Sequence, residues 1–165
     1  MSSSSSATCG GSGCLLSTLP SRVRAVGELG DAREAFLFVR VGVFAAAVPL
    51  IMRLPLPRVA ALVTRPTRRR SPSTREVEQL ERLIALAPRV APPLVRTGCL
   101  TRGVTLYWFL RRRGLDVELR FGLDPDQNDC TQGHCWLSLH DEPFLEKVDP
   151  RPRFAELYRL PLAAG

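Results

Sequence analysis

The apolar and polar positions divide the chain into a polar start, an apolar middle and an alternating final third. Residues 1–22 are rich in Ser and Gly. We predict a disordered tail there, because such a segment buries too little apolar surface to offset its ordering entropy. The apolar run at 35–52 is interrupted only by Arg40 and Pro49. It predicts a helix that packs in the core or against a partner, with membrane contact as the alternative.

Two further helices are predicted in the middle of the chain. Ser73 and Glu76 have the spacing of a capping box, which marks a helix start. The apolar face of this helix comprises Val77, Leu80, Leu83, Ile84 and Ala87. Pro88 is expected to end it, because proline lacks the backbone N–H of a helix interior. Residues 97–113 then show helical periodicity, and Gly114 has the position of a C-terminal cap.

The last third of the chain is typical of strands. At 115–123 apolar and polar residues alternate, which predicts a strand with one buried face. Two shorter strands are expected at about 134–139 and 144–148, joined by a tight turn at 141–142. A short helix at 154–158 is expected to close the chain. The order of elements is several helices first and then an antiparallel sheet, which the last helix precedes directly. This order predicts an α+β fold.

Length and composition indicate one domain of ordinary size. The chain has 165 residues, of which 45% are hydrophobic and 24% charged. This is a globular composition, and it excludes full disorder, a coiled coil or a collagen-like fibre as the main state. We therefore divide the chain into the tail at 1–22, a helical N-terminal portion at 23–90 and a core at 91–160.

Charge and cysteine content limit the partners and the compartment. The net charge is +7, and the basic run at 65–70 could meet an anionic membrane surface. This run has no interleaved aromatic residues on which bases could stack, so we predict no nucleic-acid partner. Five cysteines form no even framework, and the Ser-rich start does not resemble a signal peptide. We predict a cytoplasmic protein and leave membrane-surface association open.

Cys99 and His134 are the candidate catalytic pair. Cys99 lies at the start of the helix predicted at 97–113, where free backbone N–H groups and the helix dipole favour a thiolate. Arg96 and Arg102 add positive charge nearby. His134 begins a predicted strand 35 residues after Cys99, so its imidazole could accept the thiol proton. A buried structural cysteine is the alternative for Cys99 considered alone.

Two carboxylates could orient the imidazole of His134. A compact hairpin with its turn at 141–142 would pair Leu139 with Phe144. That register places Asp149 opposite His134 and turns Glu146 to the other face. A bulge of one residue would reverse the choice. We therefore predict Asp149 as the third member of a triad, with Glu146 as the alternative.

These residues resemble the transglutaminase-like superfamily of cysteine enzymes. The pattern is a cysteine at a helix start, a histidine two residues before Trp136 in a strand, and Asp149 before Pro150. More narrowly, the segments CLTRG at 99–103, FLRRRG at 109–114 and GHCWL at 133–137 are similar to the lasso peptide biosynthesis B2 protein family. This resemblance covers about residues 35–160. It implies a helical N-terminal portion before a transglutaminase-like, papain-like core.

The resemblance to the B2 family also implies a function. Such a protein is a cysteine peptidase that removes the leader peptide from a ribosomally synthesised precursor before macrolactam formation. Cys99 would be the nucleophile and His134 the general base and acid, with Asp149 or Glu146 as third member. The implied partners are the precursor peptide, a separate winged-helix protein that recognises the leader, and an asparagine-synthetase-like cyclase. No cofactor and no metal are expected.

Three other interpretations of the sequence remain open. The same triad could transfer an acyl group to an amine, as transglutaminases do. Cys130, His134, Cys135 and His140 could form a metal site, although neighbouring strand residues point to opposite faces. The protein could also be a non-enzymatic basic adaptor that binds a membrane or nucleic acid through residues 65–70.

Overall fold

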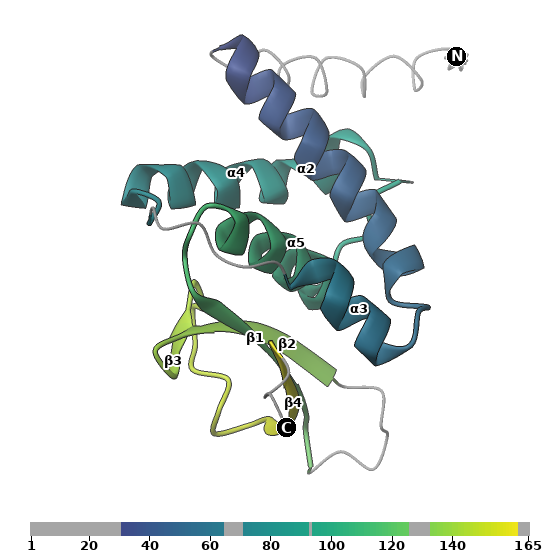
Figure 1. Cartoon of the computed structure of the whole chain (residues 1–165), viewed down its shortest axis with the longest axis vertical. Helices are drawn as coiled ribbons and strands as arrows, with labels where there is room; N and C mark the ends of the chain where they lie inside the picture. Colours follow the sequence, from purple (N-terminus) through teal and green to yellow (C-terminus); the bar gives the residue numbers. More distant parts are fainter. Residues whose placement is uncertain (1–30, 65–70, 93, 126–132, 162–165) are drawn as a thin grey trace, which may run out of the picture.

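The structure is a computed structural model that describes residues 31–64, 71–92, 94–125 and 133–161. Within these ranges the chain forms four α-helices followed by four strands (Figure 1). The expected α+β order of elements is therefore confirmed. The predicted tail at 1–22, the basic run at 65–70 and Cys130 lie outside the described residues.

The apolar run forms helix α2 (Ala32–Ile51), which packs against helices α4 (Thr74–Val90) and α5 (Cys99–Arg112). The buried residues of α2 are Glu34, Val41, Ala45 and Val48. The three apolar ones follow a spacing of four and three, so they form one narrow stripe. The buried carboxylate of Glu34 accepts hydrogen bonds from Gln79 and Arg82 of α4.

The opposite side of α2 is apolar and exposed. Its exposed large apolar residues are Phe36, Val39, Val43 and Leu50. Among the described residues, α2 is the one helix whose length and apolar composition alone would suffice to cross a membrane. A short helix α3 (Leu56–Val63) follows, and the Thr64 and Tyr107 hydroxyls share a hydrogen bond of 2.9 Å that links its end to α5.

Helix α4 begins as the sequence predicts and ends later than expected. The Ser73 hydroxyl accepts a hydrogen bond from the backbone N–H of Glu76, and the Glu76 carboxylate accepts one from the backbone of Ser73. Pro88 does not end the helix, which continues to Val90. Pro88 lies in the last turn, where it removes one backbone hydrogen bond, while burial of Ala87 holds that turn in place.

The four strands form one antiparallel sheet in the order β3-β2-β1-β4. The strands are β1 (Val117–Leu123), β2 (Gly133–Leu139), β3 (Glu142–Phe144) and β4 (Ala155–Leu160). Helix α5 packs on β1 and β2 and separates the sheet from the other helices (Figure 1). One hydrophobic core, from Val41 to Leu160, joins the helices to the sheet.

The chain closes with a strand, and the expected helix at 154–158 is wrong. Strand β4 pairs with β1, with Leu160 opposite Leu119 and Tyr158 opposite Phe121. The Phe121 and Tyr158 rings stack with their centroids 4.3 Å apart. The open edge of β1 offers backbone hydrogen bonds that a single closing helical turn could not match.

The hairpin between β2 and β3 turns one residue earlier than expected. His140 and Asp141 both have positive φ, 52° and 65°, as a two-residue type I′ turn requires. Leu139 therefore pairs with Glu142, and Phe144 pairs with Leu137. The predicted pairing of Leu139 with Phe144 is wrong, and the third strand ends at Phe144 instead of extending to residue 148.

Candidate functional site

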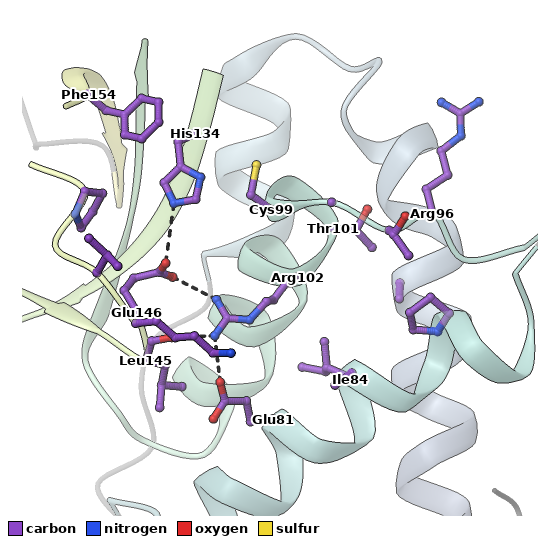
Figure 2. A pocket seen from close by; sticks show the side chains of 18 of the residues that line it. Glu81, Ile84, Arg96, Cys99, Thr101, Arg102, His134, Leu145, Glu146 and Phe154 are labelled. Carbon is purple, nitrogen blue, oxygen red and sulfur yellow. Dashed lines mark hydrogen bonds and ion pairs between the residues drawn. The ribbon is translucent and has the colours of Figure 1, made fainter. Parts of the chain in front are cut away.

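A cavity of about 820 Å³ lies where helices and sheet meet. Its walls come from α4, the start of α5, the start of β2 and the segment 145–154 (Figure 2). All four candidate residues from the sequence line it: Cys99, His134, Glu146 and Asp149. The tertiary structure therefore brings together side chains that are up to 50 residues apart in sequence.

Cys99 is the first residue of α5, and it follows Gly98 at the N-cap position. The first N–H groups of a helix have no intrahelical acceptor, and together with the helix dipole they favour a negative charge nearby. The thiol is partly exposed. Its Sγ lies 3.9 Å from the backbone oxygen of Gly133, the residue before His134. The thiol therefore lies beside the start of β2.

Helix α5 approaches β2 closely because residue 103 is a glycine. A Cβ at Gly103 would lie 2.8 Å from the Sγ of Cys135 and 3.2 Å from Leu119. Cys135 is buried, and burial raises the pKa of its thiol well above the ordinary value. Cys135 thus serves as packing between α5 and the sheet, while His134, its neighbour on the strand, lines the cavity.

The imidazole of His134 lies between an aromatic ring and a carboxylate. Its ring stacks on Phe154 with a centroid distance of 5.0 Å. Its Nε2 lies 3.6 Å from Oε2 of Glu146 (Figure 2), a separation suited to an ion pair when the imidazole is protonated. The stacked ring restricts how the imidazole can turn, and the carboxylate can stabilise its positive charge.

Glu146 is held by an arginine from helix α5. Arg102 donates a hydrogen bond of 2.9 Å from Nη1 to Oε1 of Glu146. Its Nη2 donates to the backbone oxygen of Leu145 at 2.6 Å and to Glu81 of α4 at 2.8 Å. Burial lowers the pKa of Arg102, but these hydrogen bonds more than offset this and raise it overall.

Asp149 lines the same cavity, but its contacts are with Arg151. Its carboxylate accepts hydrogen bonds of 2.8–3.0 Å from the side chain and backbone N–H of Arg151. These bonds lower the pKa of Asp149. The structure thus brings Glu146, and not Asp149, to the imidazole of His134. The cause is that β3 ends at Phe144 and the chain leaves the sheet at Leu145, which has a φ of 61°.

The sequence analysis did not predict the contacts of two residues at this site, Arg102 and Phe154. Arg102 stood out only as positive charge near the thiol, although its position one turn after Cys99 places both on neighbouring parts of α5. Phe154 fell in the segment expected to form a helix. No local pattern indicates that its ring would stack on an imidazole 20 residues earlier.

The residues that the structure describes contain no group of three or more His, Cys, Asp or Glu side chains that could hold a metal ion. Of the four ligands considered from the sequence, Cys130 lies outside the described residues. Cys135 is buried against α5, whereas His134 lines the cavity. These two neighbours on β2 therefore face different environments.

Comparison with known proteins places the chain in a family. A model of the transglutaminase-like superfamily matches residues 41–159. No curated protein and no solved structure gives a significant match. The matched region contains the thiol at the start of α5, the imidazole on β2, the carboxylate of Glu146 and the whole sheet except Leu160. Because the match covers most of the chain, this protein belongs to the transglutaminase-like superfamily, with its α+β core.

Proposed function

We propose that this protein is a cysteine peptidase that removes the leader peptide from a ribosomally synthesised precursor of the lasso type. The carrying observation is that Cys99 lies at a helix start on the same cavity as His134, whose imidazole has Glu146 beside it. Membership of the transglutaminase-like superfamily supports acyl chemistry at a thiol. The substrate class rests on the resemblance of residues 99–103, 109–114 and 133–137 to the B2 family.

The reaction has two steps. The Cys99 thiolate attacks the carbonyl carbon of the peptide bond between leader and core, while His134 holds the proton that the thiol has lost. The bond to nitrogen breaks as His134 donates this proton to the leaving amine, and the leader stays attached as a thioester. Water, deprotonated by His134, then attacks the thioester and releases the leader as a carboxylic acid. The thiol is regenerated.

The chain supplies electrostatic support for both steps. The backbone N–H of Cys99 is suited to donate to the oxyanion that forms on the attacked carbonyl. Glu146 stabilises the imidazolium of His134, and its partner Arg102 keeps the carboxylate in place. The proton transfers by His134 alone are worth on the order of 10²–10⁴-fold in rate. The attack by the thiolate adds to this.

The cavity has the size and lining for a peptide segment. Its volume of about 820 Å³ fits several residues of an extended chain. Its lining includes the apolar residues Ala45, Ile84, Ala85, Pro88 and Val95. We propose that a separate winged-helix protein presents the leader to this cavity, and that an asparagine-synthetase-like cyclase uses the released amine of the core in the cytoplasm.

The test is cleavage of the precursor encoded in the same gene cluster, in the presence of its leader-recognition protein. Mass spectrometry should find the free leader acid and the shortened core with wild-type protein, and the intact precursor with Cys99→Ala. Equal cleavage by both proteins would exclude this function. The superfamily match also allows transfer to an amine. A leader bearing an added amine, in place of the free acid, would identify the protein as an acyltransferase.

A further inference from the structure

We propose that Arg102 is a positioning residue that holds Glu146 against the imidazole of His134. This inference rests on the proposed function, because it concerns what holds Glu146, the third residue of that catalytic site, in position. The guanidinium of Arg102 connects three elements: its own helix α5, helix α4 through Glu81, and the segment after β3 through Leu145 and Glu146 (Figure 2).

The two oxygens of Glu146 have different partners. Oε1 accepts from Arg102 at 2.9 Å, whereas Oε2 lies 3.6 Å from Nε2 of His134. The arginine contact therefore leaves one oxygen directed at the imidazole. The Glu146 side chain is only 13% exposed, so little water is available to replace Arg102 as a partner.

The backbone near Glu146 also depends on Arg102. The ladder between β2 and β3 ends at Phe144, and Leu145 has a φ of 61°. The chain thus leaves the sheet immediately before Glu146, in a conformation that side-chain-bearing residues rarely adopt. The hydrogen bond from Arg102 to the Leu145 oxygen, at 2.6 Å, holds this turn to α5.

Charge alone would not give this arrangement. Glu81 and Glu146 share one cation, and the planar guanidinium offers separate N–H groups for each carboxylate and for the carbonyl. A lysine ammonium is a point charge without this fixed fork, so it would neutralise the carboxylates without holding all three acceptors in place. Arg102 is therefore expected to act through geometry, by fixing Glu146.

The test is a double-mutant cycle of Arg102→Gln and Glu146→Gln. The first readout is the rate of Cys99 alkylation by iodoacetamide at pH 6.5, quantified by peptide mass spectrometry, which needs no precursor. The second is kcat/KM for precursor cleavage. Each single change should lower the alkylation rate by about tenfold, and the double variant should be no slower than the slower single variant. If the rate reductions of the two single variants multiply in the double variant, the proposal is overturned.

Two further variants separate positioning from charge and from stability. Arg102→Lys keeps the charge and should recover only part of the lost rate, whereas full recovery would mean that charge alone matters and would overturn the proposal. If Arg102→Gln fails to fold, Arg102→Lys takes its place in the double-mutant cycle. Arg82→Gln breaks the comparable ion pair with Glu34 between α4 and α2. It should lower the melting temperature without changing the Cys99 rate.

The two readouts distinguish failure of this inference from failure of the proposed function. Coupled alkylation losses in the variants, together with wild-type protein that does not cleave the precursor, would contradict the proposed substrate and retain the role of Arg102. Protein that cleaves the precursor but whose Arg102 and Glu146 losses multiply would retain the peptidase and remove the positioning role.

Discussion

Gly103 of α5 lies so close to Cys135 of β2 that a Cβ at residue 103 would be 2.8 Å from the cysteine Sγ. This contact sets the distance between the helix that begins with Cys99 and the strand that begins beside His134. The two proposed reacting side chains are thus placed by a packing contact one turn into the helix. The same contact leads to the first prediction.

Gly103→Ala is expected to lower the free energy of unfolding by about 1–3 kcal/mol, because the added methyl overpacks the helix–sheet interface. It should also slow Cys99 alkylation by separating α5 from β2. Urea denaturation and mass spectrometry measure the two effects. A double variant of Gly103→Ala and Cys135→Ala, in which the clashing sulfur is absent, should recover part of the unfolding free energy and part of the alkylation rate.

Gly42→Ala in α2 is the matched control, because nothing lies within 4 Å of a Cβ there. It should stabilise the protein by up to about 1 kcal/mol, as expected for a glycine in a helix interior. Equal destabilisation by the two alanines would contradict the role assigned to the contact with Cys135.

The contacts of the two candidate carboxylates predict different kinetic effects. Glu146→Gln should lower kcat/KM for precursor cleavage on the order of 10²–10⁴-fold, because the imidazolium loses its carboxylate partner. Asp149→Asn should cost far less, since its carboxylate is bound to Arg151. Steady-state kinetics of the two variants decide between them, and a larger loss with Asp149→Asn would restore the assignment made from the sequence.

The buried thiol of Cys135 predicts a decline of stability at alkaline pH. Burial raises its pKa above the ordinary value of 9.0, so the folded protein retains a proton that the unfolded chain releases. The unfolding free energy should therefore fall as the pH rises above 9.0. Urea denaturation across this range should show a shallower decline for Cys135→Ala. Equal slopes in both proteins would contradict the prediction.

The capping box of α4 supports the wall of the cavity that carries Glu81 and Ile84. Ser73→Ala removes the acceptor for the N–H of Glu76 and should lower the free energy of unfolding by about 1 kcal/mol. The midpoint of thermal unfolding measures this loss. Ser71→Ala, two residues earlier and exposed, is the control and should leave the midpoint unchanged.

The sequence predicted elements whose signals are local. The capping box gave the start of α4, helical periodicity gave α5, and strict alternation gave β1. Each depends on residues a few positions apart, so no distant contact was needed. Cys99 and His134 were candidates for the same reason, because a helix start and a strand start can both be recognised locally.

Elements that depend on distant partners were predicted less well. Residues 155–160 form a strand because the edge of β1 pairs with them, and nothing within the segment itself indicates this. Pro88 is tolerated because the last turn of α4 is held by burial of Ala87. In both places tertiary contacts outweighed the local preference.

By itself, the sequence determined that a thiol stands at a helix start and that an imidazole begins a following strand. Only the tertiary structure decided which carboxylate meets that imidazole. Strand β3 ended at Phe144, the chain left the sheet at Leu145, and Arg102 then held Glu146 at the site. The physical reason is that side chains alternate between the two faces only while a strand stays paired. Beyond Phe144 this alternation no longer decides which carboxylate meets His134, and the long-range hydrogen bonds from Arg102 do.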